Sequence, residues 1–289
     1  MSDSHPALGV TADGGSPAAV RLRLDLAYDG APFAGFARQP DQVTVQGTLE
    51  AAAGRILGQQ IDATCAGRTD RGVHALAQVV HFDLDPTVAR TDRALDDLEV
   101  FRDRLDRLVG PAITIWAART VPATFHARFS ATRRNYRYRV ADRPTIAPLA
   151  RYDCWHVREP LSVTAMRAAA RQLVGEHDFA AFCKKVPGRT TVRRLDTCSI
   201  RRDGDGLLHF RLDGNAFCHN QVRSIVGSLV EVGRRRHPPE WVGQVLASRE
   251  RQGAGRVAPP QGLTLEGVGY GRRWPAAPPS GVLAGRRGV

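Results

Sequence analysis

The chain has 289 residues, of which 43% are hydrophobic, enough to build a globular core in one large or two small domains. Its 41 Lys and Arg residues outnumber the 29 Asp and Glu residues, giving a formal net charge of +12. Such an excess favours a polyanionic partner, either a nucleic acid or a membrane surface. Because no basic amphipathic helix is apparent, we expect a nucleic acid and no membrane.

The chain contains five scattered cysteines, never spaced as C-x-x-C: Cys65, Cys154, Cys183, Cys198 and Cys218. This pattern argues against a disulfide framework and a zinc site, and favours a reducing compartment. The start of the chain does not read as a signal peptide, and no apolar run approaches the roughly 20 residues of a membrane span. Metal-site and Walker-type motifs are also lacking, so we expect a cytoplasmic protein without metal or cofactor.

Nearly all of the positive charge comes from arginine, since Lys184 and Lys185 are the only lysines. The planar guanidinium group suits bidentate phosphate contacts and stacking on bases. A genome-wide compositional bias would produce the same count, so both explanations stay open.

Hydrophobic periodicity predicts the elements of the first half of the chain. Leucines alternate with charged residues over 20–28, as in a half-buried strand. Thr44 is the expected N-cap of a helix with apolar positions on one face. The amphipathic pattern over 91–109 predicts one long helix. Four further strands are expected: residues 61–66, 78–84, 113–120 and 134–141.

In the second half, Ser162 is the expected N-cap of a helix that ends near Val174. Apolar spacing predicts two more helices and a last strand: residues 218–234, 241–247 and 262–270.

A hairpin is expected from strands over 192–201 and 207–213. Its turn contains Asp203 and Asp205, a pair that suggests a calcium loop. Because the later ligands of such a loop are lacking, we predict a plain turn.

The element order repeats, with strand, helix, paired strands, helix and strand in each half. This order predicts an α+β protein of two similar subdomains, with mainly antiparallel sheets flanked by helices and a central basic cleft. We expect a catalytic subdomain at 20–142 and a second subdomain at 143–272 that completes the cleft. The Gly- and Pro-rich ends, 1–19 and 273–289, are expected to be disordered tails.

Asp70 has the surroundings of a reactive carboxylate. It lies in the run CAGRTDRGVHA, between Arg68 and Arg71 and bracketed by Gly67 and Gly72. Glycines allow a sharp turn and close approach to a ligand, and neighbouring arginines should keep the carboxylate ionised. We interpret Asp70 as a nucleophile or electrostatic anchor. A turn aspartate that bonds to its own backbone is the alternative.

The segment HARFSATRRNYRYR interleaves basic and aromatic residues. On a strand, Tyr136 and Tyr138 share one face, and Arg137 and Arg139 share the other. Aromatic rings suit stacking on an unpaired base while guanidinium groups hold phosphate. A solvated arginine edge with two core-packed tyrosines fits the pattern as well.

Arg223 interrupts the inward-facing positions of a largely apolar helix. A buried arginine needs a partner, and a carboxylate such as Asp70 is a natural candidate, although Arg223 also has the length to reach solvent. The loop FCKKVPGR, with Lys184 and Lys185, is a basic segment suited to gripping a nucleic-acid backbone.

Three long segments, taken in order, resemble the TruA family of tRNA pseudouridine synthases: CAGRTDRGVHALAQVVHFD, FHARFSATRRNYRYRV and FCHNQVRSIVGSLVEVG. The resemblance covers most of residues 20–270, including the opening AYDGAPFAGFARQ and the closing GLTLEGVGY. It implies the pseudouridine synthase fold and the isomerisation of uridine to pseudouridine at tRNA positions 38, 39 and 40.

The resemblance also implies roles for individual residues. The catalytic aspartate of the family falls on Asp70, the first tyrosine of its R-Y-R-Y strand on Tyr136, and the arginine of its last helix on Arg223. The residues expected to bind the substrate belong to the same segments and the basic loop: Tyr136, Arg68, Arg71, His74, Arg128, Arg133, Arg134, Lys184 and Lys185. The implied partners are the anticodon arm of tRNA and a second copy of the chain in a homodimer.

Two departures from the family pattern stand out. Phe36 replaces a usual tryptophan and should be tolerated, because an aromatic ring is kept. Residues 107–111 replace a usual Asn-containing segment, which affects the local loop and any tRNA contact there.

Two other classes of protein compete with this interpretation. A non-catalytic RNA-binding protein would keep the basic cleft but lose Asp70 or Arg223, and both are present. A hydrolase with Asp70 as its nucleophile would need a second carboxylate at an Asp-x-Asp spacing to hold magnesium, and none stands there.

Overall fold

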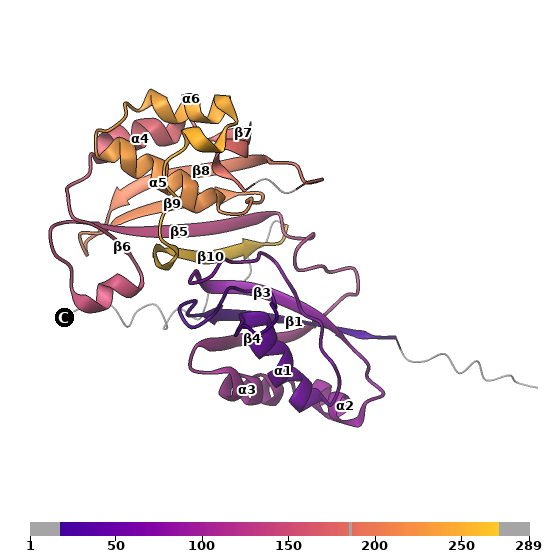
Figure 1. Ribbon diagram of the computed structural model, residues 1–289. Coiled ribbons are helices and arrows are strands. Elements are labelled where there is room, and N and C mark those ends of the chain that lie inside the picture. The colour runs from indigo at the N-terminus through magenta and orange to yellow at the C-terminus, as the bar shows by residue number, and fades with distance from the viewer. Residues whose placement is uncertain (1–17, 185–186, 272–289) are drawn as a thin grey trace, which may run out of the picture.

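A computed structural model describes residues 18–184 and 187–271 (Figure 1). The predicted tails, 1–19 and 273–289, lie outside these ranges except for residues 18 and 19, and Lys185 falls in the internal gap.

Within these ranges, ten strands form one sheet (Figure 1). The strands are β1 (Val20–Tyr28), β2 (Thr64–Cys65), β3 (His74–Leu84), β4 (Ile113–Val121), β5 (Arg133–Asp142), β6 (Trp155–Val157), β7 (Gly175–Asp178), β8 (Val192–Arg202), β9 (Leu208–Gly214) and β10 (Leu263–Gly269). Eight of them follow the order β4-β1-β3-β10-β5-β9-β8-β7, while β2 pairs with β3 and β6 with β5. Pairing is antiparallel except for β10 with β3 and β5 with β6.

The helices divide between the two halves of the sheet (Figure 1). They are α1 (Val45–Leu57), α2 (Ala89–Asp96), α3 (Leu98–Val109), α4 (Val163–Arg171), α5 (Gln221–Gly233) and α6 (Glu240–Ser248). Short 3-10 helices lie at Pro148–Tyr152, Ala180–Phe182, Arg251–Gly253 and Pro260–Gly262. Helices α1 to α3 accompany the first strands, and α4 to α6 accompany β7 to β9. The predicted mixed α+β class with a mainly antiparallel sheet is confirmed.

Strand β10, the last of the chain, joins the two halves of the sheet. It lies between β3 and β5, parallel to the first and antiparallel to the second. The sheets expected for two subdomains are therefore continuous, and a single apolar core extends through both halves. The subdomain boundaries stay predictions.

Local sequence signals set several element ends correctly. The hydroxyl of Thr44 accepts a hydrogen bond from the Gly47 N–H at 3.2 Å, and Ser162 caps α4 in the same way. The turn between β8 and β9 is a plain turn, as predicted, with the Gly206 N–H donating to the Asp203 carbonyl at 2.9 Å.

The single helix predicted over 91–109 is wrong, because Asp97 separates α2 from α3. Its backbone leaves the helical region, with φ of −140° and ψ of 89°, and its carboxylate accepts a hydrogen bond from the Val100 N–H. An aspartate favours such a capping position over a helix interior. The apolar spacing nevertheless continues across the break, which is why it predicts one helix.

Other predicted boundaries shift for similar local reasons. The helix predicted from residue 218 begins at Gln221, because Asn220 before it adopts a left-handed backbone with φ of 65°. The helix predicted to end near Val174 ends at Arg171. Of the strand predicted over 61–66, only β2 forms. The sequence patterns did not predict the short strands β6 and β7.

Candidate active site

The loop that carries Asp70 connects β2 to β3 and is held by buried side chains. Gln78, which has no exposed surface, donates a hydrogen bond through Nε2 to the Gly67 carbonyl at 2.7 Å. The hydroxyl groups of Thr69 and Tyr28 lie 2.8 Å apart in a hydrogen bond. The first half of the loop is thus anchored to β3 through Gln78 and to β1 through Tyr28.

The backbone after Asp70 turns sharply, as its glycine content predicts. Gly72 adopts a φ of 75°, a region that favours glycine, and the Val73 N–H donates to the Asp70 carbonyl at 3.1 Å. The turn packs closely on the chain at Gly30, where a Cβ atom would lie 2.1 Å from the Val73 carbonyl oxygen. This contact favours glycine at position 30 and keeps Asp70 in place.

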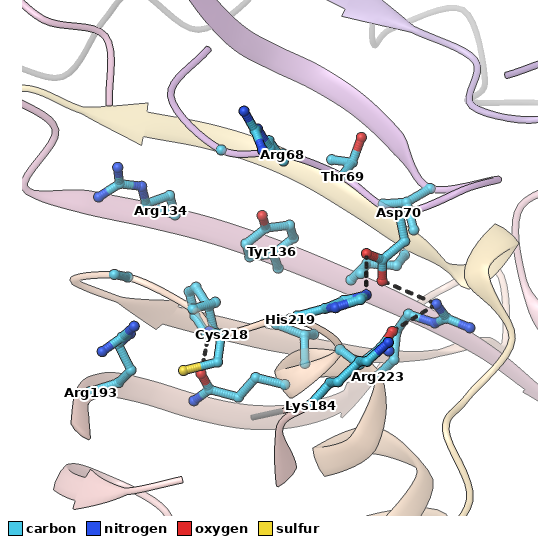
Figure 2. A pocket seen from close by; sticks show the side chains of 18 of the residues that line it. Arg68, Thr69, Asp70, Arg134, Tyr136, Lys184, Arg193, Cys218, His219 and Arg223 are labelled. Atoms are coloured by element: carbon cyan, nitrogen blue, oxygen red, sulfur yellow. Dashed lines mark hydrogen bonds and ion pairs between the residues drawn. The ribbon is translucent and has the colours of Figure 1, made fainter. Parts of the chain in front are cut away.

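The carboxylate of Asp70 contacts two side chains from the second half of the chain (Figure 2). Nη1 of Arg223 lies 3.1 Å from Oδ2, and Nε2 of His219 lies 3.3 Å from Oδ1. The Asp70 side chain is 27% exposed. The predicted pairing of Arg223 with Asp70 is confirmed, and the alternative of a turn aspartate bonded to its own backbone receives no support from these contacts.

Arg223 is itself oriented by the protein. Its Nε donates to the Ala258 carbonyl at 2.7 Å, and Nη1 also donates to Oδ1 of Asn220 at 3.1 Å. Its side chain is only 15% exposed. Arg223 therefore cannot swing freely into solvent, and it holds the Asp70 carboxylate in one orientation.

The arginines next to Asp70 in the sequence do not supply these contacts. Among the described residues, neither Arg68 nor Arg71 is an ion-pair partner of Asp70. Arg68 lines the cavity with its side chain directed away from Asp70 (Figure 2), whereas Arg71 is exposed outside the lining. The charges that surround the carboxylate come from α5 and the residues before it.

Tyr136 of β5 faces the same space (Figure 2). It is 8% exposed, and its ring packs edge-on against Phe217 with centroids 5.1 Å apart. Burial raises the pKa of Tyr136 above its ordinary value of 10, and the nearby Asp70 charge adds to the shift. The phenol therefore keeps its proton at neutral pH, which disfavours it as a direct proton acceptor and leaves its ring as an apolar surface for a base.

These groups line a cavity of about 430 Å³, within the usual range for a small-ligand site. Among the described lining residues Asp70 is the single acid, and the cations outnumber it: Arg68, Arg128, Arg134, Lys184, Arg189, Arg193 and Arg223. A cavity with this balance attracts a polyanion and leaves one carboxylate in position for chemistry. It offers no pair of carboxylates for magnesium, which the rival hydrolase would need.

The predicted substrate-binding residues divide by environment. Arg128 and Lys184 are exposed at the cavity and have side chains free to reach a backbone. Arg134 also lines the cavity but is 8% exposed, and burial lowers its pKa. Its guanidinium donates to four carbonyls, of Ala66, Arg128, Ala131 and Asn215. The observed contacts of Arg134 therefore stabilise the cavity wall.

Besides Arg71, two described residues of the predicted substrate-binding set lie outside the lining. Nδ1 of His74 accepts a hydrogen bond from the Gly30 N–H at 3.1 Å and lies 3.0 Å from the Asp29 carboxylate. Arg133 forms an ion pair with Asp213 at 2.9 Å. Their binding of substrate stays a prediction, as does that of Lys185, which lies outside the described residues.

Sequence reasoning missed His219 and Phe217 as members of the site. Both stand in the segment FCHNQVRSI, immediately before the helix that carries Arg223. Their proximity to a candidate arginine was the available signal, but histidine and phenylalanine carry no charge pattern that singles them out.

Two further properties concern the described residues only. They contain no group of three or more His, Cys, Asp or Glu side chains arranged to hold a metal ion. Their helices are too short or too polar for any of them to cross a membrane.

Known proteins resemble this chain over most of its length. A family model described as tRNA pseudouridine synthase matches residues 26–130 and 169–271. The tRNA pseudouridine synthase A of Frankia casuarinae is 46% identical over 272 residues, 93% of this chain and 94% of the relative. The corresponding proteins of Streptomyces griseus and Burkholderia mallei are 45% and 42% identical, covering 89% and 90% of this chain and 90% and 93% of their own.

Among solved structures, the archaeal box H/ACA sRNP Nop10-Cbf5 complex contains a chain that is 13% identical, with a TM-score of 0.32. The match covers 84% of this chain and 46% of that one, and at this score it carries no conclusion. The family model and the sequence relatives are sufficient without it. The chain belongs to the tRNA pseudouridine synthase family, isomerases that convert uridine in tRNA into pseudouridine.

Proposed function

We propose that this protein converts uridine to pseudouridine at positions 38, 39 and 40 in the anticodon arm of tRNA, with Asp70 as the catalytic residue. The observation that carries the proposal is the ion pair of Asp70 with Arg223 at 3.1 Å, inside a cationic cavity walled by Tyr136. The finer assignment to these positions comes from the resemblance of the three sequence segments to the TruA family.

The reaction is an isomerisation, so atoms balance without a second substrate. The bond between N1 of uracil and C1′ of ribose breaks, the uracil rotates, and C5 bonds to C1′ while its hydrogen leaves and N1 gains one. In the proposal the Asp70 carboxylate is the nucleophile and Arg223 keeps it charged and oriented. No metal or cofactor takes part.

A uridine within a helical stem must leave the base stack before it reaches the cavity, which costs a few kcal/mol. Cationic contacts along the RNA backbone and stacking in the pocket offset this cost. Arg68, Arg128 and Lys184, which are exposed around the cavity, are suited to the backbone contacts. The ring of Tyr136 is suited to stacking on the everted uracil.

The proposal includes a homodimer in which one anticodon arm contacts both subunits, and a cytoplasmic location. Support for the location is indirect: a tRNA substrate and five free cysteines both fit a reducing compartment. Light scattering of the purified protein, alone and with tRNA, tests the dimer.

The decisive experiment incubates purified protein with tRNA transcripts that contain uridine at positions 38 to 40, without metal or nucleotide. Chemical mapping should locate pseudouridine at these positions, and replacing the three uridines with cytidine should remove the product. Pseudouridine elsewhere in the tRNA would refute the site assignment. Binding without product would favour the non-catalytic RNA-binding protein.

A further inference from the structure

The wall of the cavity contains two cysteines that the proposed reaction does not use. Cys218 lines the cavity (Figure 2), and Cys183 is buried, only 1% exposed. Their two segments run side by side, because the Lys184 N–H donates to the His219 carbonyl at 3.2 Å. The two thiols are close enough for each to perturb the pKa of the other, and the Cys218 sulfur also lies 4.0 Å from the Thr191 carbonyl oxygen. Both thiols are free.

The surroundings of Cys218 favour its thiolate. The neighbouring Cys183 thiol and the charge of Arg193 lower the pKa of Cys218 below its ordinary value, against the opposing effects of burial and Asp178. The thiolate is the reactive form of cysteine, so this direction favours reaction at Cys218.

The other cysteines differ, and all five lie in the described part of the chain. Burial raises the pKa of Cys65 and of Cys198 to about 12 each, and it also raises the pKa of Cys154. Cys218 therefore combines three properties found together at no other described cysteine: a lowered pKa, access from a cavity, and a second thiol on the neighbouring segment.

Cys218 is also connected to the reacting groups through its chain neighbours. Phe217 packs on the ring of Tyr136, and His219 lies 3.3 Å from the Asp70 carboxylate. A displacement of Cys218 must move at least one of these two contacts, because all three residues are consecutive.

We propose that Cys183 and Cys218 form a reversibly oxidisable dithiol in the cavity wall, and that joining them slows pseudouridine formation. The second part rests on the proposed function of the cavity. The ligand class is a peroxide. Cys218 as thiolate attacks a peroxide oxygen and the O–O bond breaks, which gives a sulfenic acid and a hydroxide that takes up a proton from solvent to become water. The Cys183 thiol then attacks the sulfenic sulfur, an S–S bond replaces the S–O bond, and a second water leaves.

The disulfide requires the sulfur atoms to approach to about 2.05 Å, well inside a hydrogen-bond separation. We expect closure of this bond to move the Cys218 backbone, and with it Phe217 and His219. Because a misplacement of about 1 Å at a catalytic site can cost on the order of 100-fold in rate, we expect the oxidised protein to be at least about tenfold slower.

The first test uses the full chain and does not depend on activity. After treatment with hydrogen peroxide, the intact mass should decrease by two hydrogen atoms, and peptide mapping should find Cys183 joined to Cys218. Dithiothreitol should reverse the change. The Cys183→Ser variant should stop at the sulfenic acid, trapped with dimedone on Cys218, whereas the matched control Cys198→Ser should form the same disulfide as the wild type.

A labelling experiment on the wild type avoids any variant that fails to fold. Maleimide labelling of the Cys218 peptide should rise with pH around a midpoint below the ordinary thiol value, because the pKa of Cys218 is lowered. A midpoint at or above the ordinary thiol value of about 8.5, or a disulfide between other cysteines, overturns the dithiol.

The second test compares the rates of the oxidised, re-reduced and untreated protein on a tRNA transcript. A loss of at least about tenfold that dithiothreitol restores supports the coupling, and an unchanged rate with the disulfide in place overturns it. If the untreated protein forms no pseudouridine at all, the proposed function fails, while the mass and labelling results still decide whether the dithiol exists.

Discussion

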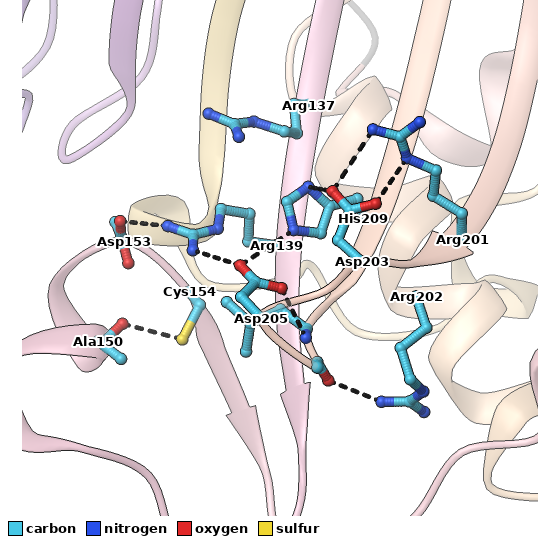
Figure 3. A network of polar contacts seen from close by, with 12 residues as sticks. Arg137, Arg139, Ala150, Asp153, Cys154, Arg201, Arg202, Asp203, Asp205 and His209 are labelled. Atoms are coloured by element: carbon cyan, nitrogen blue, oxygen red, sulfur yellow. Dashed lines mark hydrogen bonds and ion pairs between the residues drawn. The ribbon is translucent and has the colours of Figure 1, made fainter. Parts of the chain in front are cut away.

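Two regions of this protein bring arginines and carboxylates together, and they differ in charge balance. Around the cavity, seven described cations surround the single acid Asp70. In the network on the β8–β9 hairpin and the segment before β6, each carboxylate has a cationic partner (Figure 3). Arg139 pairs with Asp153 and with Asp205, the latter at 3.2 Å, and Arg201 pairs with Asp203 at 2.9 Å.

The difference separates a binding site from a structural contact. In the hairpin network the charges neutralise one another and tie a turn to a neighbouring segment. In the cavity the described cations exceed the acids, and this excess suits phosphate groups of RNA. The ratio of cations to carboxylates in each region, rather than the presence of ion pairs, indicates its role.

The strongest test removes the negative charge in each region. Asp70→Asn should abolish pseudouridine formation, because the nucleophile is lost, while tRNA affinity stays within a few-fold. Product mapping and a binding titration measure the two effects. The matched change Asp203→Asn should leave the rate within about twofold, and full activity of Asp70→Asn would refute the assignment.

Removing one arginine from each region should separate catalysis from stability. Arg223→Gln leaves Asp70 without its oriented partner and should lower kcat on the order of 100-fold. Arg139→Gln should instead lower the free energy of unfolding by about 1 to 2 kcal/mol, since its side chain is 17% exposed and bridges two carboxylates. Single-turnover rates and urea unfolding test both variants. An equal loss of stability in both with no difference in rate would contradict the comparison.

Salt dependence should sharpen the contrast between unpaired and paired arginines. We expect tRNA affinity to fall steeply between about 50 and 200 mM salt, because phosphate contacts release counterions. Arg128→Gln should reduce the slope of log affinity against log salt by about one. Arg201→Gln should leave the slope unchanged, because Asp203 already neutralises that charge. A flat salt dependence of the wild type would remove the electrostatic argument.

The smallest effect concerns His209, which lies between Asp203 and Asp205 with Nδ1 3.3 Å and Nε2 3.5 Å from their carboxylates. Burial lowers the pKa of His209 below 6.5, with Arg137 and Arg139 acting in the same direction and the two carboxylates opposing it. The unfolded chain therefore takes up a proton at higher pH than the folded chain, so stability falls as pH decreases below about 6.5.

Urea unfolding between about pH 5 and 8 checks this sign. Through His209 the wild type should lose part of its free energy of unfolding as the pH falls through this range, and His209→Gln should show a flatter profile. Identical profiles would mean that His209 titrates alike in both states.

Short-range patterns were sufficient for much of the fold. Leu22, Leu24 and Leu26 are all fully buried in β1, as their alternation predicts, and Thr44 caps α1. Asp97 shows the limit of such patterns, because apolar spacing continued through a residue that prefers to cap. Patterns of this kind depend on a few neighbouring residues, so they succeed where no distant contact competes.

By itself, the amino-acid sequence determined most of the elements, the family and the choice of Asp70, Tyr136 and Arg223 as the central residues. It offered Arg223 as a partner of Asp70, 153 positions away, but only the tertiary structure decided that this pair forms, that His219 joins it, and that the arginines next to Asp70 are not its partners. The same holds for β10, which the fold inserts between β3 and β5. The physical reason is range: periodicity and capping act over a few residues, whereas the pairing of distant strands and charges depends on how the whole core packs.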